Sequence, residues 1–258
     1  MKREEGTVVV HDAAELTQPS TRRNFLRALG LGGTIVLLPS VFAACADDAT
    51  NGLTPVGPSR ATAAAAGAVT LDLSNDIGIF NYAYALEQLE AAFYAQVATN
   101  STFYSVFTSA TDRELLLGIW KDEVAHREFL KMALGSAAIP ALTPNFTAVN
   151  FGDRNSVLTT ARTFEDLGVA AYNGAGRFIR NANNLLMAGK IVSVEARHAA
   201  AIRDTLDTTG TAFADLTSLT AFGADNATAR DGALAPSAVL PLAAPFITDT
   251  ITIGTQPS

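Results

Sequence analysis

The chain has 258 residues, of which 25 are acidic and 18 are basic, so its net charge is −7 at neutral pH. An acidic chain without a basic cluster argues against nucleic acid or anionic lipid as a partner. Cys45 is the single cysteine. Its isolation excludes an intramolecular disulfide and a thiolate metal site.

The first 44 residues have the features of an export signal. The sequence T-R-R-N-F-L-R at Thr21–Arg27 resembles a twin-arginine signal, and an apolar run follows over residues 28–41. That run is shorter than the roughly 20 residues needed to cross a bilayer. Phe42–Cys45 then resembles a bacterial lipobox, in which the cysteine is lipidated. We expect residues 1–44 to be removed after twin-arginine export, leaving a protein held on the periplasmic or outer side of the cell envelope by a lipid on Cys45.

Removal of the signal would leave a more acidic protein followed by a tether. Five of the 18 basic and four of the 25 acidic side chains precede Cys45, which leaves a net charge of about −8. Residues 45–69 are rich in Ala, Thr, Pro and Gly and show no apolar period. This composition predicts a flexible linker. We expect one globular domain after it, with a bundle over residues 70–210 and a tail over 211–258.

Four segments of the domain carry apolar residues at helical spacing. They predict helices over about 74–99, 111–134, 155–181 and 184–206. Ser74 is a plausible N-cap of the first helix, and Thr111-x-x-Glu114 has the form of a capping box for the second. Between the second and third helices, residues 137–154 are long enough for a crossover along a bundle.

The tail carries weaker signals. Apolar residues between Phe213 and Phe222 predict a short helix, and residues 236–247 predict an extended apolar segment that packs on the bundle. Residues 248–253 alternate like a strand, but the sequence shows no partner strand. The alternatives are an ordered edge, a frayed end or a contact within a homodimer.

Two of the three histidines follow a glutamate by three residues, as Glu123–His126 and Glu195–His198. Residues at i and i+3 lie on one face of a helix. Each pair can therefore direct a carboxylate and an imidazole at the same metal ion. His11, the third histidine, lies in the expected signal peptide.

A second glutamate precedes each pair and is followed by a tyrosine seven residues later. These are Glu87 with Tyr94 and Glu165 with Tyr172. The order Glu, Glu-x-x-His, repeated twice, is what a four-helix bundle needs for a two-metal carboxylate site.

The spacing of the glutamates is consistent with one shared site. Glu87 and Glu123 lie at similar distances from a loop near residues 100–110, and Glu165 and Glu195 lie 15 residues on either side of position 180. In antiparallel hairpins such positions come to the same height, because each residue of a helix rises by about 1.5 Å.

Four carboxylates in a bundle core repel one another unless cations compensate them. Two divalent ions supply four positive charges, while both imidazoles bind in the neutral form. Oxygen and imidazole ligands suit iron or manganese, and zinc also fits such a site. Two redox metals bridged by carboxylates can exchange two electrons with dioxygen or peroxide.

Several neighbouring residues have competing interpretations. Glu90 is an alternative first-helix ligand one turn after Glu87, although only Glu87 has the seven-residue spacing to a tyrosine. Tyr94 and Tyr172 either bind ligating carboxylates and supply electrons, as catalytic residues, or serve only packing.

Three more charged residues lie near the predicted ligands in the sequence. Asp122 and Asp166 are expected to face solvent or to contact the ligands. Arg203 is expected to pair with a carboxylate near the site.

Residues 74–208 resemble the ferritin-like superfamily, and most of all the ferritin-like proteins of bacteria and the related desiccation-induced plant proteins. The stretches that carry the resemblance are L-E-Q-L-E-A-A-F-Y (Leu86–Tyr94), D-E-V-A-H (Asp122–His126), T-F-E-D-L-G-V-A-A-Y-N-G-A (Thr163–Ala175) and E-A-R-H-A-A-A-I-R (Glu195–Arg203). The resemblance implies an all-α, ferritin-like four-helix bundle. The metal ligands that it implies are Glu87, Glu123, His126, Glu165, Glu195 and His198.

The sequence therefore favours an exported oxidoreductase with two iron or manganese ions, acting on dioxygen, peroxide or ferrous ion. An alternative of another class is a non-catalytic envelope protein, related to stress or desiccation, that uses the bundle as a scaffold. A third is an enzyme similar to manganese catalase.

Overall fold

The computed structural model describes residues 7–10, 34–37, 67–207 and 210–257. The chain divides into two units, residues 1–54 and 55–258. In the first unit, strands β1 (Thr7–Val10) and β2 (Thr34–Leu37) pair in parallel. The twin-arginine motif and Cys45 lie outside the described residues. None of the helices in the described ranges combines the length and the apolar character that a membrane span requires.

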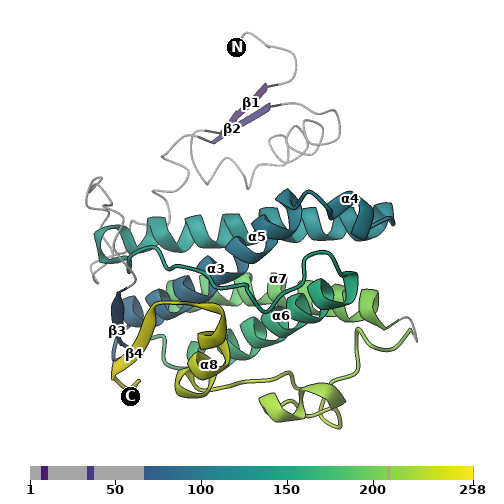
Figure 1. The fold of residues 1–258 in the computed structure, drawn as a ribbon. Coiled ribbons are helices and arrows are strands. Elements are labelled where there is room, and N and C mark those ends of the chain that lie inside the picture. Colours follow the sequence, from purple (N-terminus) through teal and green to yellow (C-terminus); the bar gives the residue numbers. More distant parts are fainter. Residues whose placement is uncertain (1–6, 11–33, 38–66, 208–209, 258) are drawn as a thin grey trace. The chain divides into compact units, whose positions relative to one another are not determined.

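The second unit is a bundle of four long helices (Figure 1). They are α3 (Asp76–Thr99), α5 (Ala110–Leu134), α6 (Arg154–Gly176) and α7 (Ala182–Leu206). Helix α3 packs mainly on α5 and α6 mainly on α7, with the short α4 (Phe103–Val106) between α3 and α5. The 3-10 turn η2 (Gly135–Ala137) and a long crossover connect α5 to α6. The predicted all-α bundle with a crossover between its second and third helices is confirmed.

Each long helix begins after a side chain that accepts a hydrogen bond from a backbone N–H of its first turn. These N-cap residues are Asn75, Ser109, Asp153 and Asn181. Such caps satisfy N–H groups that have no partner within the helix. The predicted cap at Ser74 is wrong by one residue, because the Ser74 N–H instead bonds to Asp72 in the preceding turn. The predicted box at Thr111–Glu114 starts inside α5, which Ser109 caps.

Helix α6 ends at Gly176, earlier than the predicted position 181. Asp76, at the start of α3, accepts hydrogen bonds from the backbone N–H groups of Arg180 and Asn181 and from the Asn184 side chain. This carboxylate fixes the α6–α7 turn against the start of α3.

The crossover is held against α3 by two buried polar side chains. Asn81 donates to the Ala137 carbonyl and accepts from the Ile139 N–H, and the Gln88 side chain accepts from the Leu142 N–H. Buried amides of this kind are costly without partners. The pairing explains why α3 carries polar residues on a face that the crossover covers.

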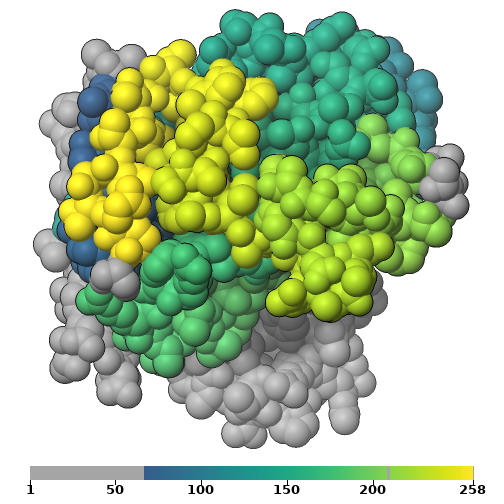
Figure 2. Space-filling view, turned by 90° about the horizontal axis from the view of Figure 1, so that it is seen from below, coloured from purple at the N-terminus to yellow at the C-terminus, as the bar shows by residue number. Residues whose placement is uncertain are grey.

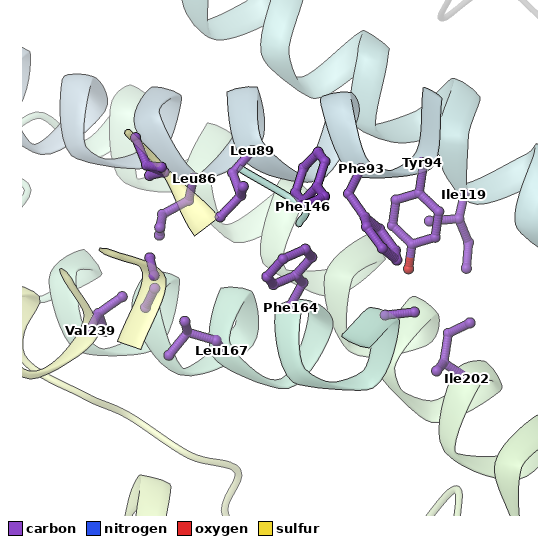
Figure 3. Packing of buried hydrophobic residues seen from close by; sticks show 14 of the residues in the cluster. Leu86, Leu89, Phe93, Tyr94, Ile119, Phe146, Phe164, Leu167, Ile202 and Val239 are labelled. Atoms are coloured by element: carbon purple, nitrogen blue, oxygen red, sulfur yellow. The ribbon is translucent and has the colours of Figure 1, made fainter. Parts of the chain in front are cut away.

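A cluster of aromatic and aliphatic side chains fills the bundle beside the functional region (Figure 3). Phe93 meets Phe164 edge to face, with ring centroids 5.1 Å apart, and Phe146 of the crossover packs on Phe93 at 5.7 Å. Edge-to-face packing is a favoured geometry for aromatic rings. The cluster links α3, α6 and the crossover into one core.

The tail packs on the bundle, and two of its predicted elements need correction. Residues 236–243 form helix α8 (Pro236–Ala243), because Pro236 occupies the first turn, where no N–H is needed. Strand β4 (Thr250–Thr255) has a partner, pairing in parallel with β3 (Ala68–Asp72). Residues 68 and 69 of that partner lie within the stretch that we predicted to be linker.

A short 3-10 helix, η3 (Thr217–Phe222), lies where a short helix was predicted, and η4 (Ala244–Phe246) follows α8. In Figure 2 the C-terminal residues, drawn in yellow, lie side by side with α6 in green, and α8 contacts α6.

The tail backbone also approaches α6 closely at Gly174. The Leu234 N–H bonds to the Ala170 carbonyl, and a Cβ at position 174 would lie 1.8 Å from the Leu234 carbonyl oxygen. Only glycine fits at this crossing.

Candidate metal centre

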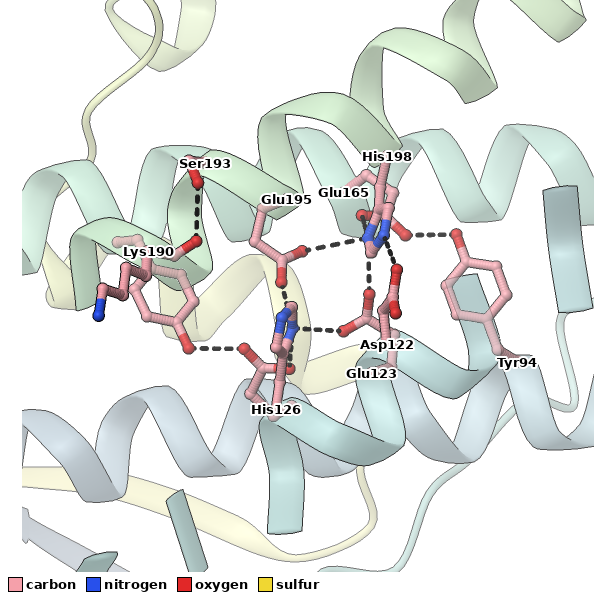
Figure 4. Close-up of polar contacts among 11 residues, drawn as sticks. Tyr94, Asp122, Glu123, His126, Glu165, Lys190, Ser193, Glu195 and His198 are labelled. Carbon is pink, nitrogen blue, oxygen red and sulfur yellow. Dashed lines mark hydrogen bonds and ion pairs between the residues drawn. The ribbon is translucent and has the colours of Figure 1, made fainter. Parts of the chain in front are cut away.

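The six predicted ligands come from all four long helices and point into the bundle (Figure 4). Helices α3 and α6 each supply one glutamate, and α5 and α7 each supply a Glu-x-x-His pair on one face. All four glutamates are fully buried, and the two histidines are nearly so; the residues are Glu87, Glu123, His126, Glu165, Glu195 and His198.

One half of the site surrounds Nδ1 of His126. This nitrogen lies 2.8 Å from Oε1 of Glu195, 3.5 Å from Oε2 of Glu123 and 3.6 Å from Oε2 of Glu87. One donor atom from each of these four residues falls within 4.8 Å of all the others.

The other half surrounds Nδ1 of His198. It lies 2.8 Å from Oε1 of Glu123, 3.4 Å from Oε2 of Glu165 and 4.0 Å from Oε2 of Glu195. These four residues form a second group of donors within 4.8 Å of one another.

Two carboxylates belong to both groups. Glu123 directs Oε2 at the His126 half and Oε1 at the His198 half, and Glu195 directs Oε1 and Oε2 in the corresponding way. Glu87 and Glu165 each belong to a single half. The arrangement is that of two adjoining positions with two bridging carboxylates, one terminal carboxylate each and one imidazole each.

The donor atoms fit metal ions better than they fit one another. Seven carboxylate and imidazole atoms of the six residues are buried and lack an aligned hydrogen bond, although some lie close together: Glu87 Oε2, Glu123 Oε1 and Oε2, Glu165 Oε2, Glu195 Oε1 and Oε2, with both histidine Nδ1 atoms in addition. Unpaired buried polar atoms are costly. Oxygen and nitrogen donors without sulfur suit iron, manganese or zinc.

Without metal, protons provide the compensating charge. Burial raises the pKa of Glu123 to about 7, although His126 and His198 oppose that shift. Burial lowers the pKa of His198, but the carboxylates of Glu123 and Glu165 outweigh it and raise that pKa to about 11. Burial and then the neighbouring carboxylates hold the pKa of Glu195 well above its usual range. Metal binding at these atoms must therefore displace protons.

The two tyrosines bind terminal carboxylates across the bundle. The hydroxyl of Tyr94 on α3 donates to Oε1 of Glu165 on α6, and the hydroxyl of Tyr172 on α6 donates to Oε1 of Glu87 on α3, both at 2.5 Å. Burial, followed by the adjacent carboxylate, raises the pKa of each phenol well above its usual range. The seven-residue spacing thus marks two reciprocal hydrogen bonds that leave one oxygen of each terminal carboxylate free.

Asp122 extends the site to the surface. Its Oδ2 lies 3.2 Å from Nε2 of His198, and its side chain is 55% exposed. A carboxylate on the outer nitrogen of a ligating imidazole fixes the orientation of the ring and raises its basicity. The residue before Glu195 is Val194, so the corresponding position on α7 carries no carboxylate.

Glu90 lies beside the six residues but outside both donor groups. It is buried, and burial together with Glu195 and Glu123 raises its pKa well above the usual range. A Cβ at Gly168 would lie 3.0 Å from Oε1 of Glu90 and 3.7 Å from Oε2 of Glu195. The glycine therefore leaves the space that Glu90 occupies. Sequence reasoning missed Gly168, although it lies 78 residues after Glu90, as Glu165 does after Glu87.

Asp166 differs from the expectation of a solvent-facing residue. It is buried and its Oδ1 lies 3.4 Å from Nε of Arg203, as expected for a pairing of Arg203 near the site. Burial raises the pKa of Asp166 to about 6, while Arg203 and Arg162 oppose the shift. The pair joins α6 to α7 behind the site.

Comparison with known proteins agrees with this geometry. No curated protein matches the chain in a sequence comparison. The sequence profile of the family described as Ferritin-like domain matches residues 75–208, which is just over half of the chain and includes all six residues of the two donor groups. The chain belongs to this ferritin-like family.

Proposed function

We propose that the protein is a ferritin-like oxidoreductase that binds two iron or manganese ions and reacts with dioxygen or peroxide. The observation that carries the proposal is the pair of adjoining donor groups that share both Glu123 and Glu195. A scaffold needs no such arrangement, because apolar residues fill a bundle core at lower cost than four carboxylates.

The proposed roles follow from the contacts. Glu123 and Glu195 bridge the two metal positions, while Glu87 with His126 and Glu165 with His198 complete one position each. Tyr172 and Tyr94 hold the terminal carboxylates at their second oxygens. Asp122 orients the His198 ring.

When bound, a pair of such metals supplies two electrons to an oxidant. The buried phenols of Tyr94 and Tyr172 lie one hydrogen bond from the terminal ligands and can pass a proton or an electron there. The surrounding apolar core excludes bulk water from the reacting atoms.

We also propose that the protein works outside the cytoplasm, anchored by a lipid on Cys45. The support is the order of the twin-arginine motif, the apolar run and the lipobox in the sequence. Twin-arginine export carries folded proteins, and so permits metal loading before transport.

The test is metal analysis of protein from Cys45 onward with Cys45→Ser, made without a metal-affinity tag. We expect two iron or manganese ions per chain, and consumption of dioxygen or peroxide when ferrous protein is exposed to either. Glu123→Gln should lose metal at both positions, because that carboxylate belongs to both donor groups. A control, Gly189→Ala, adds a methyl group with no neighbour within 4 Å and should keep both ions.

Metal-free protein that stays metal-free when supplied with Fe(II) or Mn(II) would contradict the proposal and support the scaffold alternative. Two manganese ions with peroxide disproportionation would select the catalase-like alternative.

A further inference from the structure

A second feature of the bundle core is an apolar pocket next to the candidate metal centre. All four long helices line it, with Ala83, Leu130, Ala171 and Ala188 among the lining residues. These positions precede Glu87 and Glu195 and follow His126 and Glu165. The pocket therefore lies between the metal centre and the end of the bundle where α3 and α7 begin.

The pocket runs from the centre toward the surface. At its inner end is Tyr172, whose hydroxyl bonds to Glu87. Phe129, Gly176 and Ile179 also line it and are only partly buried, whereas Ala171 is fully buried. A molecule that enters past the partly buried residues thus comes within one side chain of a terminal carboxylate.

Size limits the occupant to a very small molecule. The centre of a water-sized sphere can occupy about 10 Å³ of the pocket. That is about the space needed by a single water molecule. An aromatic or longer aliphatic substrate does not fit without displacing helices.

The chemistry of the lining disfavours water and peroxide. Only Tyr82 and Tyr172 bring polar side chains, and the Tyr172 hydroxyl is already bonded to Glu87. The Tyr82 hydroxyl is buried and has no partner. An ordered buried water requires two to four polar partners, and small apolar cavities stay dry. Peroxide carries two hydroxyl groups and would leave most of its hydrogen bonds unmade, at a high cost.

We infer that this pocket binds dioxygen and delivers it to the metal centre past Tyr172. Dioxygen is apolar, is small enough for the space and needs no hydrogen bond. The inference rests on the proposed oxidoreductase function and selects dioxygen over peroxide as its oxidant.

The first test uses xenon, an apolar atom that occupies dry cavities. Crystals of metal-free protein from Cys45 onward, with Cys45→Ser, are pressurised with xenon and the atom is located by anomalous scattering. We expect xenon among Ala83, Ala171, Ala188 and Ile191. It should disappear in Ala188→Leu, which fills the space, and remain in the neighbouring control Gly189→Ala. Ile191→Ala enlarges the pocket and should raise the occupancy, so the test stands even if Ala188→Leu does not fold.

The second test measures oxidation of ferrous protein as a function of dioxygen concentration. Ala188→Leu should raise KM for dioxygen several-fold and leave kcat at saturating dioxygen unchanged, because its metal ligands are intact. Its rate with hydrogen peroxide should equal that of the wild type. Gly189→Ala should match the wild type with both oxidants.

No xenon in the wild-type pocket, or an ordered water on Tyr82 in its place, would overturn the inference while leaving the metal proposal intact. An unchanged dependence on dioxygen in a folded Ala188→Leu protein would do the same. If xenon binds but the protein holds no metal, the proposed function fails and the delivery role fails with it.

Discussion

At the scale of single residues, the site separates carboxylates that look equivalent in the sequence. Glu87 and Glu90 are one helical turn apart, and both are buried. Glu87 lies 3.6 Å from Nδ1 of His126 and accepts the Tyr172 hydroxyl, whereas Glu90 fills the space left by Gly168. The tyrosine spacing predicted the position of Glu87 correctly, but no spacing rule indicated a fifth buried carboxylate.

Paired substitutions test this distinction. Glu87→Gln removes a charged donor from the His126 half and should weaken one of the two metal positions by more than the 10–100-fold typical of residues outside the ligand shell. Glu90→Gln should retain both metals, because the high pKa of Glu90 keeps it neutral and glutamine has the same shape. Isothermal titration of metal-free protein with Mn(II) measures both. Equal losses in the two variants would show that Glu90 is also a ligand.

Asp122 gives a second prediction at this scale. Asp122→Asn removes the negative charge from the outer nitrogen of His198 but leaves all six ligands in place. We expect affinity at the His198 position to fall about 10–100-fold, with little change at the His126 position. Competition with a chelator of known affinity resolves the two steps. A uniform loss at both positions would argue for a general effect on folding instead.

At the scale of elements, helical periodicity and turn residues predicted four helices because each buries one face against its neighbours. The errors fell where a contact distant in sequence decides the outcome. The Ala68–Asp72 strand forms because Thr250–Thr255 returns beside it, about 180 residues later. The end of α6 depends on Asp76 from another helix. Local patterns carry no information on such partners.

Gly174 tests how tightly the tail is joined to the bundle. Gly174→Ala puts a methyl carbon 1.8 Å from the Leu234 carbonyl oxygen, so the tail must move and the Leu234–Ala170 hydrogen bond is lost. We expect a destabilisation of about 1–3 kcal/mol, which is usual for overpacking, and a lower Tm in thermal denaturation. Gly189→Ala on α7 serves as the control, since nothing lies within 4 Å of its new methyl group. An unchanged Tm in Gly174→Ala would mean that the tail is not closely packed there.

At the scale of the whole molecule, stability and metal binding are linked through protons. The folded, metal-free protein raises the pKa of Glu123 to about 7 and that of His198 to about 11, both above the ordinary values of 4.5 and 6.5. The folded state therefore holds more protons than the unfolded state between these limits. Its unfolding free energy must fall as pH rises.

Metal changes the sign of this dependence. Metal competes with the same protons, so its affinity and its contribution to stability increase with pH. The difference in Tm between metal-loaded and metal-free protein should therefore be larger at pH 8 than at pH 6. Melting curves at both values, with Mn(II) or with a chelator, measure it. In His126→Ala/His198→Ala the metal-dependent difference should vanish, and a difference that shrinks as pH rises would contradict the linkage.

The fold of the whole molecule was easier to predict than its chemistry. Two Glu-x-x-His pairs with matched upstream glutamates indicated the bundle and the ligands together, because both depend on which residues share a helix face. The sharing of Glu123 and Glu195 between two positions depends on side-chain directions across four helices, and it emerges only from the structure.

The most direct test of the central claim is anomalous diffraction from crystals of metal-loaded protein at the iron or manganese absorption edge. Two peaks about 3–4 Å apart are expected. Both should lie between Glu123 and Glu195, with one peak near His126 and the other near His198. A single peak, no peak, or histidine rings turned away from the carboxylates would contradict the two-metal assignment.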